Sequence, residues 1–228
     1  MTPAGEFQFE MGIEAIRQGR LAEAEKWFTR ALQVQPGWHE ALQRRAYVRE
    51  MRGQLPAAAR DYRFSLLEAP DCIWCFEGAA DVAVKRGRWR EAEGYLDQAL
   101  HLESSNTSIL YDRGCVRLKR GRLREATEDF SRVAAFCREG RSMIALVGRA
   151  QARALMGDFE PALEDLDRAV RMRSGVREHH FIRGIVRFLS KDTKASHEDF
   201  RKAGVSPKRI QRITKSRRHL RMLLKVSL

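Results

Sequence analysis

Apolar residues recur along most of this chain at the spacing expected of paired α-helices. Ala24, Phe28 and Ala31 lie four and three residues apart, which places them on one face of a helix. Upstream of them, a stretch without proline also carries apolar residues at helical spacing. Gly19 stands between the two stretches, where its tolerance of positive φ suits the end of a helix. The pattern therefore predicts two helices joined by a tight turn.

The same arrangement recurs about every 34 residues. The glycines between helices are Gly19, Gly53, Gly87, Gly121 and Gly157, and Lys191 stands at this place in a sixth copy. A period of this length predicts an array in which each helix pair buries its apolar face against its neighbours. We predict six repeats, over residues 5–38, 39–72, 73–106, 107–140, 143–176 and 177–210, with a two-residue insertion near Cys137–Arg141.

The repeated motif resembles the tetratricopeptide repeat. The resemblance rests on the turn glycine, the Ala-x3-Phe/Tyr-x2-Ala run, and the prolines Pro36 and Pro70 after the second helix. It covers residues 1–210 and implies an all-α, right-handed solenoid of about six helix pairs. It also implies a protein-interaction scaffold or adaptor that binds a partner peptide or helix in a concave groove. Residues 211–228 are predicted to form a basic, amphipathic capping helix.

In proteins of this family the first helix of each repeat lines the groove. Carried over to this sequence, the candidate partner-binding residues are Phe9, Glu40, Arg44, Tyr47, Trp74, Glu77, Asp81, Tyr111 and Asp112. Acidic and aromatic side chains alternate in this set, which favours a peptide or helix carrying Lys or Arg next to apolar anchors. The alternative is that these are ordinary solvated helix residues.

One subset of the family binds acidic C-termini of chaperones through a clamp of Lys, Asn and Arg side chains. Phe9 and Ile13 stand where the first repeat would need Lys and Asn, and Glu77 and Asp81 have the wrong charge in the third. We therefore disfavour carboxylate-clamp chaperone binding.

The last two repeats predict a different, apolar surface. Val147, Phe181, Ile185 and Phe188 occupy the corresponding first-helix positions. An exposed apolar patch of this kind is unusual, so we expect the C-terminal helix to cover it with its own apolar stripe. The basic side chains of the tail would then face outward: Lys208, Arg209, Arg212, Lys215, Arg217, Arg218, Arg221 and Lys225.

The distribution of charge supports one alternative function. The 228 residues carry a formal net charge of +13, and residues 201–228 alone carry +10. An assembly component could use this tail, with a ridge of arginines, to dock on an anionic structure: nucleic acid, an acidic protein or a membrane surface. The ridge would comprise Arg86, Arg88, Arg90, Arg120, Arg122 and Arg124. We disfavour nucleic acid because the tail has no aromatic residue to stack on bases, and we also disfavour a membrane.

The sequence predicts no catalytic site, no cofactor and no metal site. It has no phosphate-binding loop and no nucleophile or zinc-protease motif, and the pairs Glu128–Asp129 and Glu164–Asp165 are interpreted as solvated charge. Cys72 and Cys75 lack a second ligand pair for zinc, so we expect structural thiols, with a redox or metal role as the alternative. Unpatterned cysteines, and the lack of a signal peptide, transit peptide or transmembrane segment, predict an intracellular, cytoplasmic protein.

Overall fold

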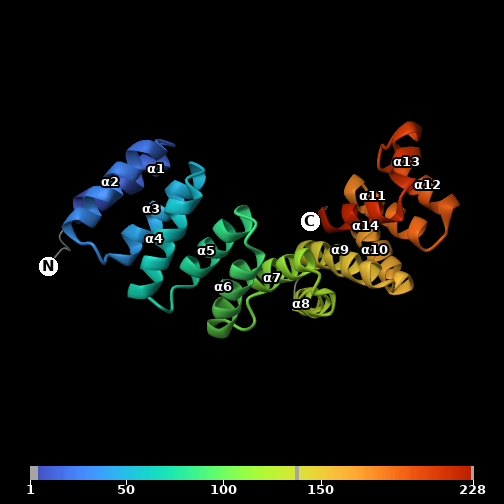
Figure 1. Cartoon of the computed structure of the whole chain (residues 1–228), viewed down its shortest axis with the longest axis horizontal. Coiled ribbons are helices and arrows are strands. Elements are labelled where there is room, and N and C mark those ends of the chain that lie inside the picture. Colours follow the sequence, from blue (N-terminus) through green and yellow to red (C-terminus); the bar gives the residue numbers. More distant parts are fainter. Residues whose placement is uncertain (1–4, 137–138, 227–228) are drawn as a thin grey trace. The chain divides into compact units, whose positions relative to one another are not determined.

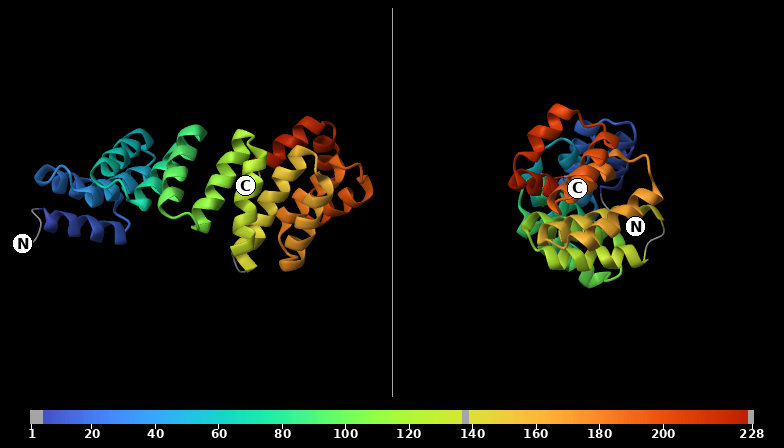
Figure 2. Two further views of the ribbon diagram at one scale, coloured as in Figure 1. Left: turned by 90° about the horizontal axis from the view of Figure 1, so that it is seen from below. Right: turned by 90° about the vertical axis from the view of Figure 1, so that its right-hand side faces the viewer.

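The computed structural model describes residues 5–136 and 139–226, and every regular element in these ranges is an α-helix (Figures 1 and 2). The chain folds as two compact units, residues 1–104 and 105–228, which we call the N-terminal and C-terminal units. Successive helices pair within each unit, which confirms the predicted all-α helix-pair fold. None of the described helices is long and apolar enough to cross a lipid bilayer.

The N-terminal unit contains three helix pairs. Its helices are α1 (Glu6–Arg17), α2 (Leu21–Val34), α3 (His39–Met51), α4 (Leu55–Glu68), α5 (Ile73–Lys85) and α6 (Trp89–Leu102). The second helix of the first and second pairs packs against the first helix of its own pair and against that of the next pair. The core is therefore a succession of small clusters, as expected of an array without one central core.

The C-terminal unit contains three more pairs and two further helices. Its helices are α7 (Thr107–Arg120), α8 (Leu123–Phe136), α9 (Glu139–Met156), α10 (Phe159–Met172), α11 (Arg177–Leu189), α12 (Thr193–Lys202), α13 (Pro207–Thr214) and α14 (Arg217–Val226). The insertion predicted near Cys137 lengthens α9, which begins at Glu139 and spans 18 residues. Cys137 itself lies outside the described residues.

Two local features follow from single residues. Lys191, which stands where the other repeats have a turn glycine, keeps the turn conformation with a φ of 76°. The tail, for which we predicted one helix, is divided into α13 and α14. Ser216 lies at the break, and its hydroxyl oxygen accepts a hydrogen bond from the His219 amide, as in a helix N-cap.

Candidate functional site

Acidic and aromatic side chains gather on α3 and α5 of the N-terminal unit. We define this acidic face by Tyr47, Glu50, Trp74, Glu77, Asp81 and Lys85. Trp74, Glu77 and Asp81 lie three and four residues apart on α5 and so share one side of that helix. The Trp74 side chain is 74% exposed and Tyr47 is also exposed, so two aromatic rings are open to a partner.

Glu50 organises the polar part of the acidic face. Its carboxylate accepts a hydrogen bond from the Lys85 ammonium at 2.5 Å and one from the Tyr62 hydroxyl at 3.3 Å. The Tyr62 ring can reach it because Gly78 on α5 leaves the necessary space. Because the Glu50 side chain is buried, these partners compensate for its loss of hydration. The sequence predictions did not include Lys85, whose importance depends on this contact between two helices.

The acidic face holds more negative charge than its own cation balances. Burial raises the pKa of Asp81, and the charge of Glu50 raises it further against the opposing effect of Lys85. Burial likewise raises the pKa of Glu77, with contributions from Asp81 and Glu103. Carboxylates with raised pKa values are ones for which an added positive charge would be favourable.

The other predicted groove residues of the N-terminal unit are placed differently. Phe9 is a packing residue. Its ring stacks on that of Trp38, with centroids 4.7 Å apart, and it meets the Phe28 ring edge-on, with centroids 5.6 Å apart. Glu40 is exposed and contacts its neighbour His39 at 3.2 Å. Arg44 is exposed and forms no ion pair with any described residue.

Tyr111 and Asp112 lie on α7 and belong to the C-terminal unit. The Tyr111 ring is half-buried and packs against Phe130, with ring centroids 5.7 Å apart. Burial is the main cause that raises the pKa of Tyr111, and its contact with Cys115 adds to this. Asp112 is exposed on the same helix.

The apolar residues predicted for the last two repeats lie under α14. Val147 and Ile185 are buried in one cluster with Leu220 and Leu224 of α14. Phe181, Phe188 and Leu223 pack against the edge of this cluster. We call these side chains of α9 and α11, with the α14 leucines that cover them, the covered apolar face.

Polar side chains hold the C-terminal end of α14 in place. The Gln151 side-chain amide donates a hydrogen bond to the Leu224 carbonyl at 2.9 Å, and the Lys119 ammonium donates one to the Lys225 carbonyl. The last carbonyls of a helix have no partner within the helix, so these two side chains satisfy groups that would otherwise lack one. α14 is thus seated on α7, α9 and α11 by both apolar and polar contacts.

The basic residues of the tail point away from this packing. Lys208, Arg209 and Arg212 of α13 are exposed, and so is Lys215, which directly follows that helix. Arg217, Arg218 and Arg221 of α14 are also exposed, while Lys225 is half-buried. Four of the side chains that line a shallow pocket of about 450 Å³ along α13 are cationic. The predicted arginine ridge is divided between the two units, and within it Arg88 and Arg122 pair with Glu91 and Glu125.

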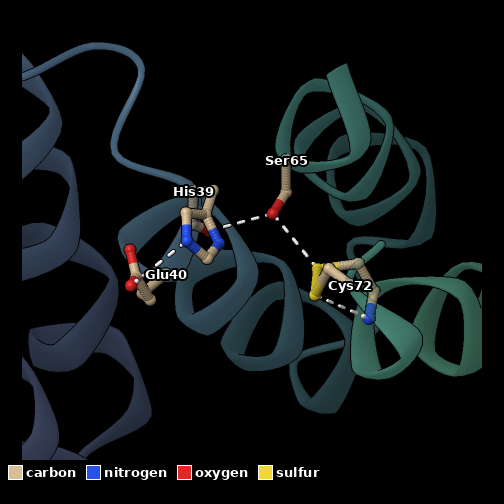
Figure 3. The surroundings of a disulfide bond; sticks show 5 residues. His39, Glu40, Ser65 and Cys72 are labelled. Carbon is tan, nitrogen blue, oxygen red and sulfur yellow. Dashed lines mark hydrogen bonds and ion pairs between the residues drawn. A yellow bond between two sulfur atoms is a disulfide. The ribbon is translucent and has the colours of Figure 1, made fainter. Parts of the chain in front are cut away.

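Cys72 and Cys75 form a disulfide at the start of α5, which corrects the prediction of free structural thiols (Figure 3). Cys72 is the residue preceding the helix, and its sulfur accepts a hydrogen bond from the Cys75 amide. The Ser65 hydroxyl lies 3.2 Å from the Cys75 sulfur and donates to the His39 carbonyl at 2.9 Å. Disulfides persist in oxidising compartments, so the cysteines do not support the prediction of a reducing compartment. The cytoplasmic location therefore stays a prediction.

A second correction concerns carboxylates of the second helices. Asp129 and Asp165, interpreted from the sequence as solvated, are buried. Asp165 accepts two hydrogen bonds from Arg149, at 2.6 and 2.9 Å, and a third from Arg153 at 2.8 Å. Arg45, Arg49 and Asp61 form the same structural arrangement, as do Arg113, Arg117 and Asp129, and Arg183, Arg187 and Asp199.

The described His, Cys, Asp and Glu side chains do not assemble a metal site. Within residues 5–136 and 139–226, no cluster of three or more His, Cys, Asp and Glu side chains is placed to hold a metal ion. The buried aspartates described above are each held by two arginines, so their role is structural.

Comparison with known proteins agrees with the fold. Two family models described as Tetratricopeptide repeat match residues 5–38 and 78–142. The structure is similar to a tetratricopeptide repeat protein from Parabacteroides merdae ATCC 43184, with a TM-score of 0.79 and 18% identity, over 89% of this chain and 80% of that chain. No curated protein sequence matches the chain.

Two further solved structures are similar at the level of the fold. YrrB, described as a TPR protein with an unusual peptide-binding site, has a TM-score of 0.66 and 18% identity, over 87% of this chain and 97% of that chain. PilW, described as a widely conserved type IV pilus biogenesis factor, has a TM-score of 0.70 and 16% identity, over 96% of this chain and 98% of that chain.

Proposed function

The chain belongs to the tetratricopeptide repeat family, and on this premise we propose that it is a non-enzymatic scaffold that captures a basic, partly apolar segment of a partner protein. The proposed binding site is the acidic face of the N-terminal unit. Its main support is one observation: the exposed Trp74 ring shares a helix side with Glu77 and Asp81, whose pKa values are both raised.

Each part of the acidic face would contribute a different interaction. Trp74 and Tyr47 offer large, rigid apolar surfaces, and such residues often dominate the energy of an interface. Glu77 and Asp81 would select Lys or Arg, because a cation nearby favours their ionised forms. Lys85 is already bound to Glu50 and would repel a peptide cation placed next to it. The peptide would therefore bind in the register that puts its Lys or Arg near Glu77 and Asp81.

The covered apolar face is the corresponding surface of the C-terminal unit, and α14 occupies it. We therefore place the partner on the N-terminal unit. We interpret α14 as an intramolecular ligand that occupies the covered apolar face of the C-terminal unit. Tyr111 and Asp112 are secondary in this proposal, because the Tyr111 ring is already packed against Phe130.

The test uses a peptide selected from a displayed library on the full chain, with its affinity measured by titration calorimetry. We expect Trp74→Ala to weaken binding by about 1–3 kcal/mol while the helix content stays unchanged. Phe136→Ala, which removes a similarly exposed ring from α8, is the matched control and should leave the affinity unchanged. Equal binding by the wild-type and Trp74→Ala proteins would remove Trp74 from the site.

A second candidate function rests on the basic residues of α13 and on Lys215, which directly follows it. Lys208, Arg209, Arg212 and Lys215 form no ion pair with any described residue, so their charge is available to an anionic structure. Salt dependence distinguishes the two candidates. Capture anchored by aromatic rings should lose modest affinity between low and physiological salt, whereas phosphate-type binding should fall steeply.

A further inference from the structure

A pocket opens on the second-helix side of the N-terminal unit, away from the residues that define the acidic face. It has a volume of about 670 Å³ and lies between α4 and α6, with Phe76 of α5 among its lining residues. Leu67 is 75% exposed and Phe64 is 56% exposed, although both are large apolar side chains. Tyr95 of α6 also lines the pocket. Contiguous exposed apolar surface of this kind marks a docking site more often than a chance exposure.

Two arginines line the same pocket without a partner. Arg60 and Arg63 are exposed, three residues apart on α4, and neither forms a hydrogen bond or ion pair with any described residue. Arg45, by contrast, lies on the adjacent α3 and is paired with Asp61. The pocket therefore combines an apolar floor with two positive charges. A complementary ligand would carry an apolar side chain flanked by carboxylates.

The chain carries such a group on α1. Glu6, Phe7 and Glu10 lie within about 100° of the circumference of that helix. Phe7 is 67% exposed, and its ring is supported at an edge by Trp27, with centroids 6.1 Å apart. The carboxylates of Glu6 and Glu10 make no hydrogen bond or ion pair with any described residue. Glu14, one turn further along, is already engaged by Gln18 and Arg17.

We propose that the pocket between α4 and α6 binds α1 of a second copy of this chain, with Phe7 entering the pocket and Glu6 and Glu10 facing Arg60 and Arg63. Docking within one chain is excluded, because α1 packs on α2 at the start of the unit whereas the pocket lies between α4 and α6. The two contacting patches are different surfaces, so the contact is head-to-tail. Such contacts produce open chains or rings of copies rather than an isologous dimer.

The test is sedimentation analysis of the full chain over a wide range of protein concentration. Self-association is expected, and Arg60→Glu/Arg63→Glu should raise its dissociation constant about tenfold or more. Glu6→Arg/Glu10→Arg should do the same, and an equimolar mixture of the two variants should associate again, because each brings back opposite charges at the contact. Arg44→Glu, which reverses an exposed and unpaired arginine on α3, is the matched control and should associate like the wild type.

Phe7→Ala supplies an independent measurement, since it removes the anchor without changing any charge. It should weaken association while circular dichroism of the monomer is unchanged. A chain that stays monomeric at every concentration would overturn the proposal, as would association that is unaffected by either charge reversal. Binding of the library-selected peptide at the acidic face is measured separately, so it can succeed or fail whatever the outcome here.

Discussion

The ring of Phe28 occupies the space that Gly12 leaves on the facing helix. A Cβ added at Gly12 would lie 2.6 Å from the Phe28 ring. The same pairing of glycine with phenylalanine occurs at Gly114 and Phe130, and at Gly184 and Phe200. Where the large residue is Leu96 or Leu166, the equivalent small residue is Ala80 or Ala150. At residue scale, the sizes of two side chains on paired helices are matched in each of these repeats.

Gly12→Ala should therefore destabilise the first helix pair by about 1–3 kcal/mol through overpacking. Phe28→Leu in the same chain should recover part of this loss, because it recreates the combination of Ala80 and Leu96. Gly94→Ala is the control, since a Cβ there meets nothing within 4 Å on α6; it should be neutral or stabilising. Hydrogen exchange of α1 and α2 measures the effects of Gly12→Ala and Phe28→Leu, and hydrogen exchange of α5 and α6 measures that of Gly94→Ala. Additive effects of Gly12→Ala and Phe28→Leu would contradict the pairing.

The raised pKa values on the acidic face predict a pH dependence of partner binding. A cationic segment binds the ionised carboxylates, so affinity should be complete above the raised pKa values and should fall as the pH drops through them. The fall should begin at a higher pH than the ordinary values of 3.8 for Asp81 and 4.5 for Glu77 would give. Calorimetry at several pH values tests this, with Glu77→Gln/Asp81→Asn expected to bind more weakly and with a flatter pH profile. A wild-type affinity that rises on acidification would contradict it.

At the scale of elements, a buried ion cluster joins the two helices of four pairs and is replaced by apolar residues in the other two. Arg149 and Arg153 of α9 both bind Asp165 of α10. The equivalent residues of the third repeat are Ala79, Ala83 and Tyr95, and those of the first are Met11, Ala15 and Trp27. The fold thus accepts either solution at the same positions.

This equivalence makes a prediction about stability. Asp165→Asn should destabilise the α9–α10 pair by about 3–5 kcal/mol, because it leaves two arginines without their buried counter-charge. The triple variant Arg149→Ala/Arg153→Ala/Asp165→Tyr recreates the third repeat and should be close to the wild type, since apolar replacement of a buried ion cluster is often neutral or stabilising. Hydrogen exchange of α9 and α10 distinguishes the two. A triple variant as unstable as the single one would contradict the prediction.

These clusters also show what the sequence could and could not predict. The helix pairs followed from spacing within about 34 residues, because turn glycines and apolar periodicity are local signals. The burial of Asp165 depends on Arg149, sixteen residues away on the facing helix, so the residues next to Asp165 in the sequence do not indicate it. The signal that could have found it is the spacing Arg-x3-Arg-x11-Asp, which recurs in four repeats. The division of the tail had a local signal in Ser216, a good N-cap residue, which we did not use. The contact of Lys85 with Glu50 needed the packing of α5 on α3.

At the scale of the whole molecule, we expect the effect of a mutation on stability to stay mainly within its own unit. In an array of helix pairs the total is roughly a sum over neighbouring interfaces, so a change in one unit need not be felt in the other. The covered apolar face belongs entirely to the C-terminal unit, where Leu220 and Leu224 are fully buried.

Leu220→Ala and Leu224→Ala should each cost about 2–5 kcal/mol, since each removes a buried side chain from a packed cluster. The loss should appear as faster hydrogen exchange in α9, α11 and α14, with no change in α1 to α6. Met222→Ala, on the exposed side of α14, is the control and should leave exchange unchanged. Faster exchange in both units would contradict the local character of the effect.

The attachment of α14 to the chain that it covers has a consequence for any competitor. A tethered helix acts as a ligand at an effective concentration on the order of millimolar, whatever the concentration of the protein. A free helix with the same leucines would therefore displace it only when present at a comparable concentration. The covered apolar face would therefore stay closed to a free helix that is present at a much lower concentration.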